Sequence, residues 1–539
     1  MWTWKTIIGH QFFLKSLFVL LNRVLLFIDN LRAFTRWVHE MKKRESSFFR
    51  FWKICVKKIL RKNFYTERNL PMRSVAQTVF PFKLEEEKDL KLTSHAGLPL
   101  VHELIHRMSL PKLIRKHLKL KKKGWGEEEL LEVLISLGVV GGDHMSDIEI
   151  LKKDPAFLAL IRKKNGLPSV KTVERFLKLF HEEQEKPEGV DAWVPLESKA
   201  LKNLSKIHRT VTQKLIEKSG ITTATIENDA TIIFSHKEEA LGTYKGGIGY
   251  APVVGTIAEL GLVLHDEFRD GNVPASFEVT SFFKKCLSVL PSTIKKVRTR
   301  LDGAYYNLEE LIPYLKKQKI EFSITGKKSK SVIEWIEALP EGQWKPLMKI
   351  TNSGLKPTGK EWVEMFWTSA AGTREQMQER SLRCLITRKS EHQWELFKKE
   401  FQSEVEEKDR YEMIVTNMEW QGDKLIRWHY ERGGTIEHIH DRIKNDLAGG
   451  TLPCAEFGAN AAWFRIQCLA WNLIRALQIH ALPQNFSNCH LKRLRLWLFN
   501  IAGKVIWHGR QLILKLTEGN PSFPIYQEAR LKIAALSFP

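Results

Sequence analysis

The sequence is poor in cysteine and has no uninterrupted apolar run, and both absences exclude classes of protein. Its six cysteines, among 539 residues, include no C-x-x-C pair, so neither a disulfide framework nor a structural zinc site is expected. The most apolar stretch, residues 11–28, is broken by Lys15, Asn22 and Arg23, whereas a membrane-spanning helix needs ~18 to 20 mostly uncharged apolar residues. The same breaks argue against a secretory signal peptide. We therefore expect a reduced, intracellular protein with no membrane partner.

Acidic residues are also in deficit, because 62 Asp and Glu face 85 Lys and Arg, which leaves a net charge of +23. Such an imbalance favours a polyanionic partner such as nucleic acid. Hydrophobic residues make up 43% and charged residues 27% of the chain, which is typical of a folded globular protein and excludes disordered and collagenous classes. Residues 1–71 are especially basic. We predict that they form a basic amphipathic extension, or a leader upstream of a true start at Met72.

The pattern of apolar residues divides the rest of the chain into predicted domains. From residue 72 to 220, apolar residues at helical spacing, punctuated by Gly and Pro, predict a helical domain that binds DNA. In residues 221–326, β-branched runs predict three consecutive strands and then a strand, a helix and a strand, which is the order of a ribonuclease-H-like core. The expected fold class is therefore α/β, with a mixed sheet flanked by helices.

The second half of the chain completes this predicted architecture. Residues 327–421 are rich in strand signals and look like a β-rich insertion between two parts of the core. Helical character resumes in the second part of the core, residues 422–482. The final predicted domain, residues 483–539, is a basic helical segment in which residues 490–516 form one helix with a basic and an apolar face.

Three carboxylates stand out by their positions. Asp229 lies within the first β run, where a charged side chain is buried unless it is paired or bound to a cation. Asp302 closes the fourth strand directly before a glycine, and strand carboxyl ends are where α/β sheets gather ligand sites. Glu437 lies near the start of a predicted helix. Carboxylates that converge from sheet and helix suit Mg²⁺, and two such ions can activate a nucleophile and stabilise the leaving oxygen of a phosphodiester.

The order of these residues carries a resemblance to a known family. Its motifs are Asp229 after Ile226, the glycine-rich stretch Gly242 to Tyr250 followed by Pro252, an R-x-G-N turn from Arg269 to Asn272, Asp302 after Arg300, and a third motif of Tyr430, Arg432, Glu437 and Lys444. In these motifs the chain resembles the DDE transposases of bacterial insertion sequences, cut-and-paste enzymes of the group named YREK after its third motif. The resemblance extends from about His95 to Leu516.

The resemblance implies a concrete function. Asp229, Asp302 and Glu437 would be the catalytic residues and would bind two Mg²⁺ ions, with Mn²⁺ as a substitute. A 3′-hydroxyl freed at the element end would then attack target DNA. The resemblance also implies a homodimer that pairs two terminal inverted repeats of double-stranded DNA in the bacterial cytoplasm, at the nucleoid. Tyr430, Arg432 and Lys444 would contact this DNA.

Several alternatives remain open at this stage. Tyr430 is two residues before Arg432, where the group has three, and Arg432 is five residues before Glu437, where the group has four. Glu431 is a competing third carboxylate. His438 and His440 are two residues apart, so they do not share a helix face as a zinc-binding pair would. A catalytically inactive or domesticated DNA-binding protein derived from such an enzyme is the alternative function, and a nuclease without strand transfer is a third.

Overall fold

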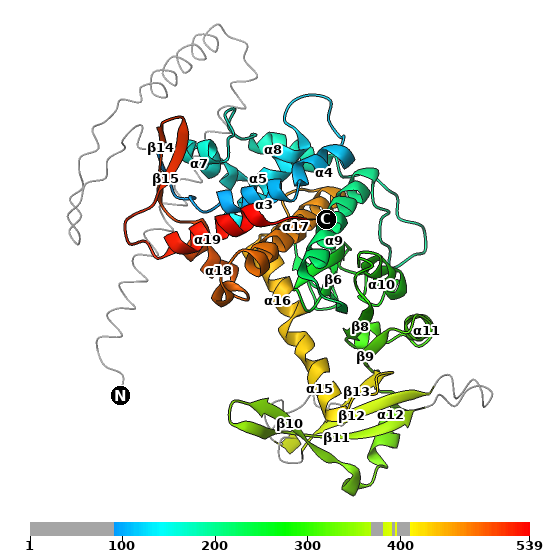
Figure 1. The fold of residues 1–539 in the computed structure, drawn as a ribbon. Coiled ribbons are helices and arrows are strands. Elements are labelled where there is room, and N and C mark those ends of the chain that lie inside the picture. The colour runs from blue at the N-terminus through cyan, green and yellow to red at the C-terminus, as the bar shows by residue number, and fades with distance from the viewer. Residues whose placement is uncertain (1–90, 368–380, 391–393, 396–409, 539) are drawn as a thin grey trace, which may run out of the picture. The chain divides into compact units, whose positions relative to one another are not determined.

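The computed structural model describes residues 91–367, 381–390, 394–395 and 410–538, so the predicted extension, residues 1–71, lies outside the described residues. A nine-stranded sheet organises the chain, with the strand order β10-β11-β12-β13-β9-β8-β2-β6-β7 (Figure 1). Its strands are β2 (Thr223–Ala230), β6 (Val253–Ile257), β7 (Leu262–Glu267), β8 (Lys296–Leu301), β9 (Glu321–Thr325), β10 (Lys345–Thr351), β11 (Gly354–Trp367), β12 (Leu382–Lys389) and β13 (Tyr411–Thr416).

The order and direction of the central strands give the predicted ribonuclease-H-like core. Strand β2 runs parallel to β8, which runs parallel to β9, while β6 and β7 add antiparallel strands on the other side. The register pairs Ile226 of β2 with Thr299 of β8. Asp229 and Asp302 each follow their paired residue by three positions, so the topology alone brings both aspartates to the same end of two adjacent strands.

Helices cover both faces of this core, and the alternation of side chains along each strand assigns residues to a face. Asn228 and His265 lie against α10, where Asn228 contacts Cys286 and His265 contacts Phe282. Asp266, the next residue on β7, bonds instead to α17 through Arg465. The helices of the core are α10 (Val279–Leu287), α11 (Leu311–Lys317), α15 (Gly422–Tyr430), η5 (Glu431–Gly434), α16 (Ile436–Asp441), the π-helix η6 (Arg442–Asp446) and α17 (Phe457–His480).

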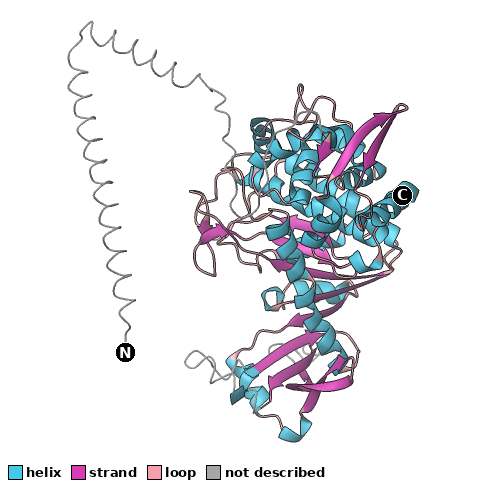
Figure 2. Cartoon of the chain, turned by 90° about the vertical axis from the view of Figure 1, so that its left-hand side faces the viewer, coloured by secondary structure: helices cyan, strands magenta, loops and turns pink. Residues whose placement is uncertain are grey.

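The predicted helical domain surrounds α17, which is buried along most of its length. Figure 2 shows helices, in cyan, gathered in this part of the chain and strands, in magenta, prevailing around β10–β13. None of the described helices has the length and the apolar composition needed to cross a membrane. The helices of this domain are α3 (Pro99–Arg107), α4 (Leu110–His117), α5 (Glu127–Val140), η1 (Met145–Asp147), α6 (Ile148–Lys152), α7 (Pro155–Leu160), α8 (Val170–Lys178) and α9 (Lys199–Ser219).

The β-rich segment between Asp302 and Glu437 continues the core sheet instead of forming a separate sheet. Strand β13 pairs antiparallel with β9, with Ile414 opposite Thr325, and β12, β11 and β10 add to it in turn. Two short helices, α12 (Lys330–Glu337) and η3 (Glu341–Gln343), precede β10. Helix α15 then contacts β9, β10 and β11, so the insertion leads directly into the third motif.

The C-terminal segment departs from the predicted helix over residues 490–516. It begins with η7 (Gln484–Phe486), α18 (Leu491–Leu494) and the π-helix η8 (Arg495–Phe499), and ends with α19 (Ser522–Ala535). Between them, β14 (Gly503–His508) and β15 (Gln511–Lys515) form a hairpin that also pairs with β1 (Leu92–Thr93). The reason is the turn: Gly509 and Arg510 both have positive φ, of 55° and 65°, which fits a two-residue hairpin turn and ends a helix.

Candidate functional site

The two aspartates lie next to each other and share a cationic neighbour. The Oδ1 atom of Asp229 accepts a hydrogen bond from the backbone N–H of Ala230 at 2.9 Å, and Oδ1 of Asp302 accepts one from Ala304 at 3.0 Å. Both Oδ2 atoms approach Arg432, with distances of 3.5 Å from Nη1 to Asp229 and 3.9 Å from Nη2 to Asp302. The guanidinium of Arg432 therefore lies between the two carboxylates.

The electrostatics of Asp229 are those of a carboxylate that lacks sufficient positive charge around it. Burial raises its pKa to about 6, and the negative charges of Asp302 and Glu437 add to this effect, while Arg432 and the Ala230 N–H oppose it. A carboxylate in this state gains free energy from a bound cation. The donor set of Asp229 and Asp302 therefore fits a hard divalent ion, which prefers carboxylate oxygens.

Glu437 lies on the first turn of α16 and is exposed, and its charge reaches Asp229. No three His, Cys, Asp or Glu side chains in the described ranges gather closely enough to hold a metal ion. The structure thus brings Asp229 and Asp302 together with Arg432, and leaves Glu437 next to them without closing a three-carboxylate cluster.

Beneath the aspartates, a buried ion pair joins both aspartate strands to the third motif. Glu227 precedes Asp229 by two residues and Arg300 precedes Asp302 by two, and the Arg300 Nε donates to the Glu227 carboxylate. Thr435, directly before α16, donates its hydroxyl to the same carboxylate. Arg300 Nη1 also donates to Glu431 at 3.1 Å. Glu431, the competing third carboxylate, is therefore already the partner of a buried arginine.

The Tyr430 hydroxyl contacts the insertion strands. It donates to the carboxylate of Glu412 on β13 and lies 2.9 Å from the Thr387 hydroxyl on β12. The Lys360 ammonium lies over the tyrosine ring, 4.8 Å from its centroid. Tyr430 still exposes 39% of its surface.

Lys444 and His440, the last two residues of interest in the third motif, pack against the chain around Asp229. Lys444 donates through Nζ to the carbonyl of Ile232 at 2.5 Å, and burial together with the charge of Lys245 lowers the pKa of Lys444. His440 is buried with Nε2 3.9 Å from Asp229 Oδ2. Burial, with Lys444 and Arg432 nearby, lowers the pKa of His440 to about 3, so its ring is neutral.

Three residues of the site were not predicted from the sequence: Glu227, Arg300 and Thr435. A signal was available for the first two, because each lies two residues before a candidate aspartate and so on the same strand face. Thr435 carried no such signal, since its contact with Glu227 depends on how the third motif packs onto β2.

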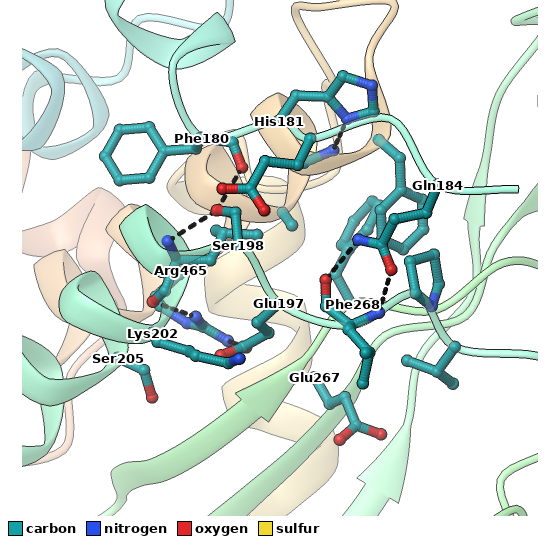
Figure 3. A pocket seen from close by; sticks show the side chains of 18 of the residues that line it. Phe180, His181, Gln184, Glu197, Ser198, Lys202, Ser205, Glu267, Phe268 and Arg465 are labelled. Carbon is teal, nitrogen blue, oxygen red and sulfur yellow. Dashed lines mark hydrogen bonds and ion pairs between the residues drawn. The ribbon is translucent and has the colours of Figure 1, made fainter. Parts of the chain in front are cut away.

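A cavity of about 750 Å³ lies away from the carboxylates, between the segment that follows α8 and the end of β7 (Figure 3). Several of its charged residues have partners within the chain. Arg465 donates to Glu197 at 2.6 Å and to Asp266 at 3.0 Å, and Glu267 pairs with Lys285 and Arg269. The polar groups of this cavity thus hold α9, β7 and α17 together, and we assign no chemistry to it.

Comparison with known protein families gives a match over most of the chain. No curated protein matches the chain. A solved structure described as the cryo-EM structure of a piggyBac transposase synaptic complex with hairpin DNA is similar at 9% identity, with a TM-score of 0.37, over 76% of this chain and 80% of that one. The family model described as transposase DDE domain group 1 matches residues 86–538. The chain therefore belongs to this family of transposase DDE domains.

Proposed function

We propose that this protein is a metal-dependent DNA transposase that cuts the ends of its element and joins them to target DNA. The observation that carries the proposal is the pair of adjacent aspartates, Asp229 and Asp302, at the same end of two parallel strands of the core. Membership in the family of transposase DDE domains supports the same function. The sequence resemblance described above implies that Asp229 and Asp302 are the first two acidic residues of such a site.

In this proposal, Asp229, Asp302 and Glu437 hold two Mg²⁺ ions, for which Mn²⁺ substitutes. Bound divalent ions supply positive charge to a phosphodiester and lower the pKa of an attacking water or hydroxyl. The contribution of the chain is to hold the carboxylates in place. The Glu227–Arg300 pair fixes β2 against β8, and Thr435 ties the start of α16 to Glu227.

Arg432 and Lys444 are the proposed phosphate contacts of the site. Arg432 is a cation next to Asp229, and its Nη1 has no hydrogen-bond acceptor among the described residues although it is buried. Lys444 lies against the chain that leaves β2, through its bond to the Ile232 carbonyl. An arginine presents a rigid fork that matches phosphate oxygens. We propose that the guanidinium turns from the aspartates to a DNA phosphate when metal enters. Tyr430, which is partly exposed, contributes to the same DNA surface.

The remaining parts of the proposal concern assembly. The helical domain and the net charge of +23 would hold double-stranded DNA, and two copies of the chain would pair two element ends. The product of the first cut, a 3′-hydroxyl, would be the nucleophile of the second step. Each step exchanges one phosphodiester bond for another or hydrolyses one, so no nucleotide cofactor is required.

The test is cleavage and joining of DNA that carries the sequences flanking the coding region, with Mg²⁺ present. Asp229→Asn, Asp302→Asn and Glu437→Gln should each lower the rate by at least about a thousandfold while DNA binding persists, because each removes a charge that holds the metal. Glu431→Gln is the matched control and should keep activity. Wild-type protein that binds these ends without cutting them would support the catalytically inactive alternative, and cutting without joining would support a nuclease.

A further inference from the structure

His440 is a buried imidazole next to the aspartates, and the proposed function leaves it without a role. It lies on α16, three residues after Glu437, and exposes 7% of its surface. Both of its ring nitrogens are buried, and neither has a hydrogen-bond partner among the described residues. A buried polar atom without a partner gives up its hydrogen bonds to water for nothing, so most such atoms in folded proteins are paired. The two nitrogens therefore need an explanation in the function of the site.

Packing alone does not require an imidazole at this position. Ile436, Ile439, His440 and Ile443 recur at the spacing of one helix face, and all four are buried. The nearby His438, on another side of α16, is exposed. A leucine at position 440 would fill about the same space as the imidazole without burying two polar atoms. The property to be explained is therefore the pair of nitrogens, which the buried face of α16 carries toward β2.

The Nε2 atom of His440 approaches Asp229. It lies 3.9 Å from Oδ2 of that carboxylate, slightly beyond the range of a hydrogen bond. Arg432 Nη1 approaches the same oxygen at 3.5 Å, and it too has no hydrogen-bond acceptor among the described residues. The other oxygen, Oδ1, already accepts from the Ala230 N–H at 2.9 Å. Oδ2 thus has two nitrogens near it and a hydrogen bond to neither, and a small rotation of the carboxylate would bring it to His440.

Charge distinguishes the two nitrogens that approach Asp229. Arg432 is a cation, and a metal ion at the same carboxylate would repel it. Burial, with the charges of Lys444 and Arg432, lowers the pKa of His440 and keeps its ring neutral. A neutral imidazole has one N–H donor and one acceptor nitrogen, so it can hold a carboxylate in place without cancelling the charge that attracts the cation. Carboxylates that bind metals commonly accept a bond of this kind from a neighbouring group.

We propose that His440 positions Asp229 for the metal: its Nε2–H donates to Asp229 Oδ2 and fixes the orientation of the carboxylate when metal enters and Arg432 turns away. The inference rests on the proposed function and adds a positioning residue to its site. His440 acts through Asp229 and is not itself a ligand, since the nitrogen that faces the site carries the donated proton. Helix α16 then supplies both the third carboxylate, Glu437, and the support for the first.

The test is the affinity of the full chain for Mn²⁺ without DNA, followed through the electron paramagnetic resonance signal of the free ion. His440→Leu fills the space without a donor and should weaken Mn²⁺ binding by about 10- to 100-fold. His440→Gln places an amide N–H near the position of Nε2 and should restore the affinity of wild type. The urea midpoint of His440→Leu in EDTA should not fall, because the ring has no hydrogen-bond partner among the described residues to lose. A structural role would lower this midpoint.

His438→Leu is the matched control, because His438 lies on the same helix and is exposed; it should bind Mn²⁺ as wild type does. Wild-type affinity in His440→Leu, equal weakening in the leucine and glutamine variants, or a lower urea midpoint in His440→Leu overturns this inference and leaves the proposed transposase intact. Coupling of bound Mn²⁺ to an imidazole nitrogen in pulsed resonance spectra, lost in His440→Leu, also overturns it, because His440 would then be a ligand. Absence of Mn²⁺ binding by wild type, or binding that Asp229→Asn does not weaken, overturns both proposals.

Discussion

At the scale of single residues, the candidate site is defined by charges that the fold forces together. Asp229 could be identified from the sequence because its place in a β-branched run fits the order of the other motifs, whereas an aspartate in a strand is by itself ordinary. Its surroundings could not be identified, because the pairing of Glu227 with Arg300 depends on the register between β2 and β8. A charged residue in a strand indicates that a partner exists, and only the register tells which residue that partner is.

The raised pKa of Asp229 predicts a penalty on the stability of the metal-free protein. A folded-state pKa of about 6, above the usual value near 3.9, means that the folded chain holds this proton more tightly than the unfolded chain. The penalty is absent below about pH 4 and complete above about pH 6. Asp229→Asn should therefore unfold at higher urea concentration than wild type at about pH 8 in EDTA, by about 1 to 3 kcal/mol. The difference should vanish below about pH 4, and a variant less stable than wild type at about pH 8 would contradict this.

The buried Glu227–Arg300 pair predicts a large cost when one partner is removed. Arg300→Met should destabilise the protein by about 3 to 5 kcal/mol, because it leaves the fully buried Glu227 carboxylate without its guanidinium. Arg298→Met is the matched control, two residues earlier on β8 and paired with Glu321 near the surface, and it should cost only about 1 kcal/mol. Urea unfolding measures both. Equal losses in the two variants would show that the buried pair has no special role.

At the scale of elements, the strands of the core and most of the insertion could be predicted, because β-branched runs and Gly turns mark them clearly. The helix expected over residues 490–516 is instead a hairpin. Apolar residues in Lys504–Lys515 fit both a helical and an alternating pattern, and the two positive-φ residues Gly509 and Arg510 decide between them. The continuity of the insertion with the core sheet could not be predicted, because it rests on three residue pairs between β13 and β9.

Within residues 231–250, three strands form a small sheet that is bonded to Gly271 through Gly249. The strands, in their order in the sheet, are β3 (Ile233–Phe234), β5 (Ile248–Tyr250) and β4 (Leu241–Gly242). This anchoring predicts that two glycine substitutions differ in their effect on stability. Gly271→Ala should destabilise the protein by about 1 to 3 kcal/mol, because the added Cβ meets carbonyl oxygens that cannot move easily. Gly242→Ala, within this small sheet, has open space around its Cβ and no positive φ, so it should have little effect on stability. Thermal unfolding compares them, and limited proteolysis should cut Gly271→Ala within residues 231–250 sooner than wild type. A Gly271→Ala protein as stable as Gly242→Ala would mean that the turn at Gly271 does not hold the small sheet of residues 231–250.

At the scale of the whole molecule, one buried ion network connects helices that lie far apart in the sequence. Asp266 on β7 accepts from Arg465 on α17 at 3.0 Å, and Arg465 also donates to the Leu201 carbonyl on α9 at 3.0 Å. Both charged side chains are almost completely buried. The packing of the helical domain onto the core therefore depends on a pair that the sequence separates by 199 positions, which no local pattern could reveal.

This network predicts how acid affects the stability of the protein. Burial alone would raise the pKa of Asp266, but Arg465 and His208 hold it well below its usual range. The stabilisation is therefore present above about pH 4 and is lost as the pH falls below that value. Asp266→Asn should lose about 3 to 5 kcal/mol at neutral pH, because Arg465 stays buried with its main partner gone, and should show a flatter loss of stability below about pH 4. Urea unfolding at several pH values tests both, and parallel curves for variant and wild type would contradict the assignment.

We propose that β2, β8 and α16 supply one metal site next to bound DNA. Fe²⁺ substituted for Mg²⁺ in the DNA complex, with ascorbate and peroxide, cuts the polypeptide chain only close to the bound ion, so the fragments report directly which segments surround it. We predict cuts close to Asp229, Asp302 and Glu437, suppressed by excess Mg²⁺ and absent in Asp229→Asn, with Glu431→Gln cut like wild type. Cutting that is confined to other segments, or that persists unchanged in Asp229→Asn, would contradict the account.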